Sequence, residues 1–312
     1  MTPMRVLFYG TPAFAIPTLH ALRARHQVVA AVTQPDRPAG RGQRFQASPV
    51  KTAALEHGIP VLQPVRLRAP EWPARLAEHP ADVAVVVAFG QILPRAVLDL
   101  PARGSINVHA SLLPRYRGAA PVAWAIIRGE RETGITTFQM DPGMDTGPTL
   151  LQRSTPIGPE ETAGELAERL AVLGADVLLE TLDRLDTLVP HPQDSALATL
   201  APRLRKEDGT VDWTEPAAVL AARVRGLNPW PGAATVTPAG RLLIWRARAI
   251  AGRGAPGVLT QVDGHVALGT GAGLLEPLEV QPENRRAMDW DAYLRGARLG
   301  PGAPLGATVP RG

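Results

Sequence analysis

Hydrophobic positions follow two alternating patterns over the first 188 residues. Short apolar runs such as 5–9 and 28–32 alternate with segments in which apolar residues recur every three or four positions. The run at 82–89 is apolar without interruption, which is typical of a parallel strand covered on both faces. A long amphipathic helix is indicated from Thr162 onward. Further strands are predicted at 61–62, 105–108, 135–140 and 149–153, and further helices at 15–25 and 49–56.

This alternation of strands and helices predicts a doubly wound, mostly parallel α/β domain over residues 1–188, of the Rossmann-like kind. The pattern then dissolves at 189–205, a segment with three prolines and no periodicity, which we expect to be a linker. Beyond it, one helix at 216–225 precedes five short strand candidates between 233 and 280, separated by turns that contain Gly and Pro. Residues 206–312 are therefore predicted to form a smaller β-barrel domain of the oligonucleotide-binding type.

Composition narrows the class of protein. The chain has 312 residues, 45% of them hydrophobic and 20% charged, which is ordinary for a globular enzyme. It contains no cysteine, which excludes disulfides, iron–sulfur clusters and a cysteine nucleophile. No apolar run approaches the length of a membrane span, and the first residues lead straight into a strand rather than a signal peptide. We therefore expect a cytoplasmic protein without a membrane partner.

Charge is distributed unevenly along the chain. Residues 1–202 carry 19 Lys and Arg against 19 Asp and Glu, whereas residues 203–312 carry 14 against 10, so the net charge of +4 lies in the last third. A basic second domain beside a neutral first one is compatible with a polyanionic partner such as nucleic acid. A solvated face in an arginine-rich chain explains the same numbers, so charge alone does not decide.

Several familiar motifs are missing. The turn after the first strand, 10–14, lacks the second and third glycines of a dinucleotide fingerprint, which weighs against NAD or FAD. Neither Lys51 nor Lys206 lies in a phosphate-binding loop, no nucleophilic serine elbow is present, and no two histidines are spaced i, i+4 for zinc. Chemistry without a resident cofactor or metal, or with a diffusible cosubstrate, becomes the main possibility.

Three polar side chains form a candidate catalytic set. Asn107 and His109 are two positions apart in a predicted strand, so their side chains share one face of it. Asp145 follows a later strand in the glycine-rich loop 141–147, which could turn the carboxylate toward that face. Taken singly, each has an ordinary structural explanation as a core, turn or capping residue. Together, at the carboxyl ends of a sheet, an amide, an imidazole and a carboxylate suggest an acyl-transfer site.

These residues also carry a resemblance to a known family. Asn107, His109 and Asp145, with the segment 111–114 (SLLP), resemble the active-site set of the 10-formyltetrahydrofolate-dependent formyltransferases. The likeness continues, in the order of the chain, through 33–42 (TQPDRPAGRG), 111–121 (SLLPRYRGAAP), 206–209 (KEDG), 228–231 (NPWP) and 284–294. It therefore runs through both predicted domains.

The resemblance implies that the α-amine of methionine, esterified to its initiator tRNA, attacks the formyl carbon of 10-formyltetrahydrofolate, which gives N-formylmethionyl-tRNA for translation initiation. In that reaction Asn107 would donate a hydrogen bond to the developing oxyanion. His109, with its charged form favoured by Asp145, would be a second donor, and Asp145 would orient the imidazole and help to relay a proton through water. The cosubstrate is a folate, and no metal is implied.

The same resemblance assigns the folate and tRNA contacts. The folate would lie against a flat slot lined by Phe89, Gly90, Gln91, Ile92, Leu93, Asp141, Ser111, Leu112, Leu113 and Pro114. The segment 34–51 is rich in Pro and Gly, which predicts a loop, and it carries a local charge of +3, so it could contact tRNA phosphates. The expected tRNA contacts are Arg37, Arg41, Arg44 and Lys206, together with the basic C-terminal domain. We expect a monomer, because a two-domain RNA enzyme needs no partner chain.

Other functions remain open from the sequence. A formyltransferase acting on glycinamide ribonucleotide or an amino sugar would share the three catalytic residues, and so would a hydrolase that releases formate from formyltetrahydrofolate. The basic segment 34–51 and the basic second domain favour RNA as the acceptor. A non-catalytic RNA-binding protein on an α/β scaffold is the alternative from another class, and it leaves Asn107, His109 and Asp145 without a role.

Overall fold

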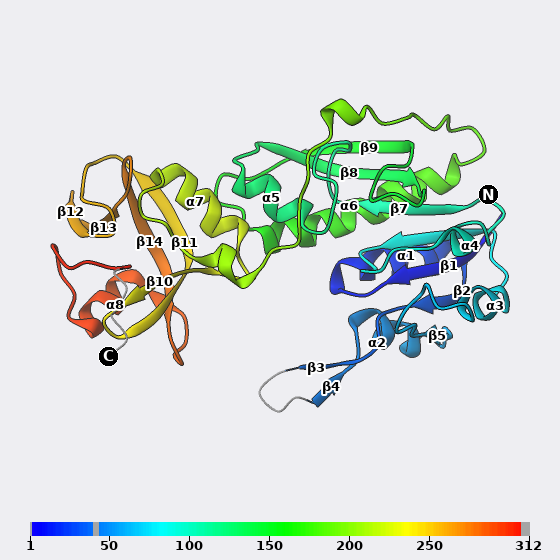
Figure 1. Ribbon diagram of the computed structural model, residues 1–312, viewed down its shortest axis with the longest axis horizontal. Coiled ribbons are helices and arrows are strands. Elements are labelled where there is room, and N and C mark those ends of the chain that lie inside the picture. The colour runs from blue at the N-terminus through cyan, green and yellow to red at the C-terminus, as the bar shows by residue number, and fades with distance from the viewer. Residues whose placement is uncertain (1, 40–43, 307–312) are drawn as a thin grey trace. The chain divides into compact units, whose positions relative to one another are not determined.

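The computed structural model describes residues 2–39 and 44–306 of the chain (Figure 1). By its internal contacts the chain divides into two compact units. Unit 1 comprises residues 1–121, 132–156 and 167–202, and unit 2 comprises 122–131, 157–166 and 203–312. Each unit therefore contains segments from more than one part of the sequence.

Unit 1 is built on a seven-stranded sheet in the order β5-β2-β1-β6-β7-β8-β9. The first four pairings in this order are parallel, whereas β8 pairs antiparallel with β7 and β9 pairs antiparallel with β8. The strands are β1 (Arg5–Gly10), β2 (Gln27–Val32), β5 (Val61–Leu62), β6 (Val83–Val87), β7 (Ser105–His109), β8 (Glu132–Gln139) and β9 (Thr149–Pro156). The predicted mostly parallel α/β domain is confirmed, and the order of strands reverses beside β1.

Burial explains why the central strands form. All five residues of β6 are buried, so this strand is covered on both faces, and Val85 and Val87 are completely inaccessible to solvent. On one face, Leu7 and Tyr9 of β1 pack with Phe89 and Leu93. Full burial of each such side chain contributes about 1.5–3 kcal/mol, so the central strands supply much of the unit's hydrophobic stabilisation.

The helices of unit 1 that the sequence predicts are those long enough for the spacing of apolar residues to repeat. The helices α1 (Ile16–Arg25), α2 (Pro49–Glu56) and α6 (Ala163–Asp183) were predicted, whereas α3 (Trp72–Ala77) and α4 (Arg95–Leu98) are too short to show a period. The first turn of α6 belongs to unit 2. The segment predicted as a loop at 34–51 contains a hairpin of β3 (Arg37–Ala39) and β4 (Arg44–Gln46).

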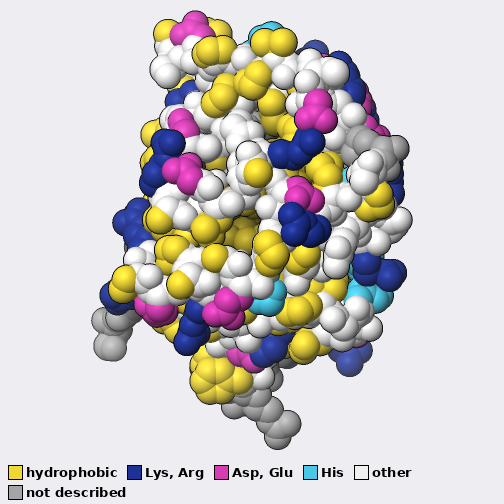
Figure 2. Space-filling model, turned by 90° about the vertical axis from the view of Figure 1, so that its right-hand side faces the viewer, with side chains coloured by type: hydrophobic (Ala, Val, Ile, Leu, Met, Phe, Trp, Pro, Cys, Tyr) yellow, Lys and Arg dark blue, Asp and Glu magenta, His cyan; other side chains and the backbone are white. Residues whose placement is uncertain are grey.

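Charges on the surface of unit 1 are mixed. Basic and acidic side chains lie close together across the face drawn in Figure 2. The unit's ion pairs include Arg5 with Asp82 at 2.7 Å and Arg25 with Asp183 at 2.9 Å, both partly exposed. Such pairs contribute about 0–1 kcal/mol each, and this face offers no concentration of a single charge sign.

Unit 2 contains an antiparallel sheet with the strand order β10-β11-β14-β13-β12, and β15 pairs with β14. Its strands are β10 (Ala233–Thr237), β11 (Gly240–Ile250), β12 (Leu259–Val262), β13 (His265–Gly269), β14 (Leu274–Pro282) and β15 (Met288–Asp289). Its helices are α5 (Pro121–Ile127), which begins at the last residue of a unit 1 segment, α7 (Ala217–Gly226) and α8 (Trp290–Ala297). The sequence predicted a smaller β-barrel domain here, and the presence of a C-terminal β domain, with an antiparallel sheet, is confirmed.

Residues 189–202, which fall within the predicted linker 189–205, are part of unit 1, and we call them the strap. His191 pairs with Thr149 at the start of β9, and Leu200 pairs with Arg117. The strap therefore follows the edge of the sheet and the loop after β7, and it is held to both by backbone hydrogen bonds.

The start of α6 is fixed by a capping box within unit 2. The backbone N–H of Thr162 donates to Glu165 at 2.8 Å, and the backbone N–H of Glu165 donates to the Thr162 hydroxyl at 3.3 Å. Arg246 pairs with the same carboxylate, whose side chain is 48% exposed. The Thr162 backbone N–H first, and then Arg246, lower the pKa of Glu165 to about 2.

We expect Glu165→Gln to reduce stability at pH 7 by about 0.5–1 kcal/mol, because glutamine keeps the capping geometry but loses the charge. The pKa of the folded state lies below the ordinary value of 4.5, so the carboxylate's contribution is present above about pH 4.5 and is lost as the pH falls toward 2. Urea unfolding at pH 7 and pH 3 measures this, with Glu168→Gln on the same helix as the control. An equal difference between Glu165→Gln and the original chain at both pH values would contradict it.

Candidate active site

Two residues of β7 provide the amide and the imidazole. Asn107 and His109 alternate with buried Ile106 and Val108, so both side chains leave the strand on one face. Asn107 is half-buried, and its amide makes no hydrogen bond to any residue that the structure describes. His109 is only 6% exposed. The free amide of Asn107 and the buried imidazole of His109, on one face of the strand, are suited to bind a small polar ligand.

Asp145 reaches His109 from an unexpected direction. Because β8 runs antiparallel to β7, the end of β8 lies beside the start of β7, where the Met140 N–H donates to the Ser105 carbonyl at 2.8 Å. The loop between β8 and β9 then turns back along the sheet toward His109. The sequence predicted that these groups converge at the carboxyl ends of a sheet. His109 is the last residue of β7 and Asp145 follows the end of β8, but because the two strands are antiparallel these ends lie at opposite ends of the sheet, so the loop after β8 has to reach back to His109.

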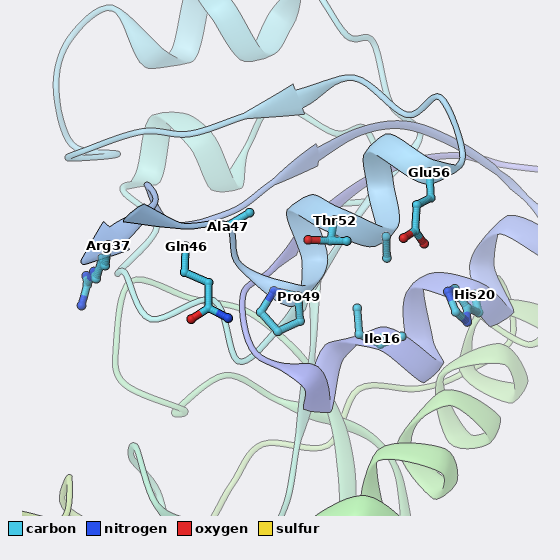
Figure 3. Close-up of a pocket in the computed structure, with 9 residues that line it drawn as sticks. Ile16, His20, Arg37, Gln46, Ala47, Pro49, Thr52 and Glu56 are labelled. Atoms are coloured by element: carbon cyan, nitrogen blue, oxygen red, sulfur yellow. The ribbon is translucent and has the colours of Figure 1, made fainter. Parts of the chain in front are cut away.

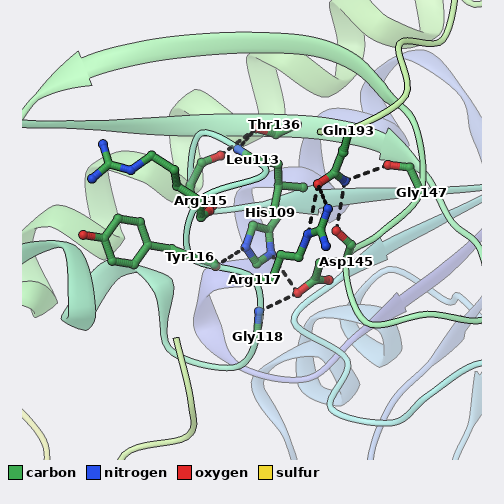
Figure 4. A network of polar contacts seen from close by, with 11 residues as sticks. His109, Leu113, Arg115, Tyr116, Arg117, Gly118, Thr136, Asp145, Gly147 and Gln193 are labelled. Atoms are coloured by element: carbon green, nitrogen blue, oxygen red, sulfur yellow. Dashed lines mark hydrogen bonds and ion pairs between the residues drawn. The ribbon is translucent and has the colours of Figure 1, made fainter. Parts of the chain in front are cut away.

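Hydrogen bonds to the backbone of Tyr116 and Gly118 hold the imidazole and the carboxylate next to each other (Figure 4). Asp145 Oδ2 accepts the Gly118 backbone N–H at 2.7 Å and lies 3.7 Å from His109 Nδ1. His109 Nε2 lies 2.9 Å from the carbonyl oxygen of Tyr116, which can only accept. Both ring nitrogens therefore face oxygen atoms, and these two contacts set the orientation of the ring.

Segment 111–114 is held rigidly after β7. The Thr136 hydroxyl donates to the Ser111 carbonyl at 2.6 Å and accepts the Leu113 N–H at 3.1 Å. Gln152 donates to the Leu113 carbonyl at 2.6 Å. The Ser111 hydroxyl is occupied by the Arg115 carbonyl at 2.7 Å. The Leu113–Pro114 peptide is cis, and Leu112 is only partly buried.

The loop after β6, predicted to contact folate, is anchored from beneath. Phe89 is buried and packs edge-on against Tyr9, and its carbonyl accepts from the Thr11 hydroxyl at 3.0 Å and from Gln34 at 3.2 Å. The side chain of Gln91 is bound to the backbone of residues 64 and 67. Gly90 has a positive φ of 83°, and Ile92 is 53% exposed. The loop therefore presents Ile92 and its backbone, while Phe89, Gln91 and Leu93 support it.

Backbone strain gathers in the loops of this site. Of the six non-glycine residues with a left-handed φ in the described parts of the chain, Ala88, Tyr116 and Asp145 lie in the three loops that follow β6, β7 and β8. Such conformations cost about 1–3 kcal/mol each and persist where the surroundings impose them. In the last loop, Asp141 accepts from the Gly143 N–H at 3.0 Å and the Thr146 hydroxyl at 2.7 Å, which shapes the turn before Asp145.

The predicted tRNA contacts lie in both units. Arg37 is exposed on β3 and donates to Gln34 at 3.2 Å, and Arg44 lies on β4. Arg41 lies outside the described residues. Lys206 is exposed in a short 3-10 helix, Lys206–Gly209, of unit 2. Lys51 is paired with Asp36 at 2.6 Å, and this lysine lowers the pKa of Asp36, so the local excess of positive charge rests on the arginines.

A pocket of about 590 Å³ lies beside this hairpin, between it and the helices α1 and α2 (Figure 3). Arg37 and Glu56 stand at its two ends. The remaining lining residues are Ile16, His20, Gln46, Ala47, Pro49, Thr52 and Ala53. The set does not include Asn107, His109 or Asp145, so the pocket is separate from the catalytic group.

Four contributors to the site were missed in the sequence. Gly118 holds the carboxylate, Thr136 holds segment 111–114, and Arg117 and Gln193 bond to each other next to the Asp145 loop. Arg117 and Gly118 lie in the quoted motif 111–121, but a backbone donor gives no sequence signal. Gln193 lies in the segment that the sequence predicts to be a linker.

Within residues 2–39 and 44–306, no group of three or more His, Asp or Glu is arranged to hold a metal ion, and no helix is long and apolar enough to cross a membrane.

Comparison with known proteins identifies the class. A model of the formyl transferase family matches residues 4–182, and a model of the formyl transferase C-terminal domain matches residues 203–298. The chain therefore belongs to the formyl transferase family. Full-length relatives place it among the proteins named methionyl-tRNA formyltransferase. The one from Citrifermentans bemidjiense is 52% identical over 98% of both chains, and the one from Solibacter usitatus is 52% identical over 97% of this chain and 99% of its own.

Solved structures share the fold at low identity. WlaRD, a sugar 3N-formyltransferase solved in the presence of dTDP and 5-N-formyl-THF, has a TM-score of 0.66 at 16% identity, over 92% of this chain and all of WlaRD. HypX from Aquifex aeolicus in complex with tetrahydrofolic acid has a TM-score of 0.64 at 19% identity, over 94% of this chain. The chain spans about half the length of HypX. These likenesses establish the formyltransferase fold.

Gly118→Ala tests the support of the carboxylate. Gly118 has a φ of 120°, and a Cβ there would lie 2.7 Å from the Ala201 carbonyl oxygen, so the N–H that holds Asp145 must move. We expect the rate of formyl transfer to fall by at least about tenfold, because small displacements of catalytic groups are costly. The control is Gly129→Ala, where φ is 73° but no atom lies within 4 Å of a Cβ, and its rate should stay unchanged. Equal rates for the two variants would show that the Gly118 contact is dispensable.

Proposed function

We propose that this chain transfers the formyl group of 10-formyltetrahydrofolate to the α-amine of methionyl-initiator-tRNA, which gives the formylated initiator for protein synthesis. The observation that carries the proposal is that His109 and Asp145 lie next to each other on the face of β7 that also carries the free amide of Asn107. It stands in a chain about half identical, over its whole length, to proteins named for this reaction.

The three side chains fit the chemical task. The α-amine of an aminoacyl ester titrates near pH ~7.7–8, so a useful fraction is neutral without a strong base. Asn107 donates to the formyl oxygen as negative charge develops there, and the positive charge of His109, stabilised by Asp145, acts on the same oxygen. Asp145 Oδ1 makes no hydrogen bond to described residues. It is therefore the atom that accepts a proton from the attacking amine, through water, and passes it toward the departing nitrogen.

The folate contacts proposed from the sequence are compatible with the loops around this group. Ile92, Leu112 and the backbone at Gly90 are accessible, and Asp141 borders the loop that carries Asp145. Phe89, Gln91, Leu93, Ser111, Leu113 and Pro114 act mainly by holding these loops in place. The 10-formyltetrahydrofolate supplies the formyl carbon, and the chain supplies orientation and charge stabilisation.

For the acceptor, we propose that the hairpin of β3 and β4 and the basic residues 203–312 hold tRNA. Arg37 is exposed on β3, Arg44 lies on β4, and Lys206 is exposed in unit 2. Arg41, which lies outside the described residues, is the other candidate in the segment 34–51. Contacts of this kind read phosphates and shape rather than sequence. We further propose that the chain acts in the cytoplasm and as a monomer, since an RNA enzyme with two domains needs no partner chain.

The deciding experiment offers the protein 10-formyltetrahydrofolate together with methionyl-initiator-tRNA, glycinamide ribonucleotide or a nucleotide-linked amino sugar, and measures which amine gains the formyl group. We expect formyl-methionine on the tRNA and at least about a hundredfold slower transfer to the small amines, which cannot engage the basic residues outside the catalytic group. Release of free formate without any acceptor would identify a hydrolase. Transfer to a small amine at a comparable rate would overturn the proposed acceptor.

A further inference from the structure

The strap, residues 189–202, is bound to the loop that positions His109 and Asp145. The Arg117 N–H donates to the Thr199 carbonyl at 2.8 Å, and the Ala201 N–H donates to the Arg117 carbonyl at 2.7 Å. The Thr199 hydroxyl accepts the Tyr116 N–H at 2.9 Å. Tyr116 and Gly118, the two residues whose backbones hold His109 and Asp145, thus lie on either side of a residue paired with the strap.

A single side chain of the strap bonds directly to the Asp145 loop. The half-buried amide of Gln193 donates to the carbonyl of Asp145 at 2.9 Å and to the carbonyl of Gly147 at 2.7 Å (Figure 4). Its oxygen accepts from Arg117 Nε at 3.1 Å and from an Arg117 terminal nitrogen at 2.7 Å. Gln193 therefore joins the loop that carries the carboxylate to the loop that carries Gly118.

Arg117 fixes the orientation of this amide. Its guanidinium has only donors, so the atom of Gln193 that faces it must be the oxygen, and the NH₂ group must face the Asp145 loop. Arg117 is 7% exposed and forms no ion pair with a carboxylate among the described residues. A buried guanidinium without a carboxylate is costly, so its bonds to Gln193 favour one arrangement of the amide over the flipped one.

The Asp145 loop needs such support. Asp145 has a φ of 55°, a conformation that costs free energy for a residue with a side chain. At Gly147 a Cβ would lie 1.8 Å from the Gln139 carbonyl, so the backbone there is already tightly packed. The two hydrogen bonds of Gln193 fall on the carbonyls of Asp145 and Gly147, so they hold the backbone on both sides of Thr146.

We propose that the strap is a positioning element of the active site and that Gln193, oriented by Arg117, is the positioning residue that keeps the Asp145 carboxylate opposite His109. This inference rests on the proposed function. Gln193 touches no reacting atom, so its effect is on the geometry of transfer and not on substrate binding. Loss of the two donated hydrogen bonds lets the loop rotate and moves the carboxylate away from the imidazole.

Two variants of Gln193 separate this role from simple packing. Gln193→Ala removes all four bonds. Gln193→Glu keeps the acceptor for Arg117, and even strengthens it, but faces the carbonyls of Asp145 and Gly147 with an oxygen that cannot donate. If the contact with Arg117 were all that mattered, Gln193→Glu would behave like the original protein. If the donated bonds position Asp145, it must be as slow as Gln193→Ala.

The measurement is steady-state and single-turnover formylation of methionyl-tRNA by the full chain. We expect both variants to lower kcat by about 10- to 100-fold, the scale of a misplaced catalytic group, with KM for both substrates within about twofold. The control is Asp194→Ala, which removes the cap of the short helix at Ser195–Leu197 in the same strap without touching the loop, and it should keep normal kinetics.

A normal kcat for Gln193→Ala, recovery of the rate by Gln193→Glu, or an equal loss in Asp194→Ala would each overturn the assignment. If Gln193→Ala is unfolded at the assay temperature, as a thermal melt will show, the comparison of Gln193→Glu with Asp194→Ala decides. The unaltered protein is assayed alongside the variants. If it fails to formylate methionyl-tRNA, the proposed function is refuted. If it succeeds, the comparison of the variants with it tests the role of Gln193 alone.

Discussion

The hydrogen bond between the Gly118 N–H and the carboxylate of Asp145, 2.7 Å long, is the interaction on which the active site depends. It ties a loop from the antiparallel part of the sheet to the loop after the last parallel strand, and it brings the carboxylate to 3.7 Å from His109. The opposite nitrogen of His109 is bound to the Tyr116 carbonyl, so the imidazole has acceptors on both sides. This geometry fixes the plane of the imidazole and places the carboxylate next to it.

Stability and function are divided between different parts of unit 1. The buried strands and the packed residues beneath the loop after β6 supply the hydrophobic core. The loops above them contain strained residues at Ala88, Tyr116 and Asp145, which the core and the strap hold in place. This division is expected where side chains must be fixed before the substrates bind, since a preorganised site avoids the cost of rearrangement during the reaction.

The sequence predicted the fold well wherever a repeating hydrophobic period existed. The uninterrupted apolar run of β6, the helical period of α6 and the five strand candidates of unit 2 all correspond to elements of the structure, whereas β15 and α8 were not predicted. The hairpin β3–β4 was missed because its Pro- and Gly-rich sequence suggests an irregular loop, and α3 and α4 because one or two turns show no period. Segment 189–202 was expected to be a linker, since its three prolines gave no sign of the backbone pairing that holds it to unit 1.

The candidate catalytic residues were visible because an amide, an imidazole and a carboxylate stand out from their apolar surroundings. The residues that hold them in place were not visible in the sequence. Gly118 acts through its backbone, and the partners of Gln193 are 46, 48 and 76 residues away in sequence, contacts that no local pattern encodes. The direction from which Asp145 arrives depends on the antiparallel pairing of β8 with β7, which periodicity cannot specify.

The account is tested most directly by the single-turnover rate of formyl transfer to methionyl-tRNA in Asp145→Asn, measured with enzyme in excess and both substrates saturating. Asparagine keeps the size of the side chain and an oxygen that can accept the Gly118 N–H, but it removes the charge beside His109 and the acceptor for the proton of the amine. We predict a rate at least about 10²-fold below that of the unaltered protein, the scale of losing a principal catalytic group. A rate within a factor of about three would contradict the account.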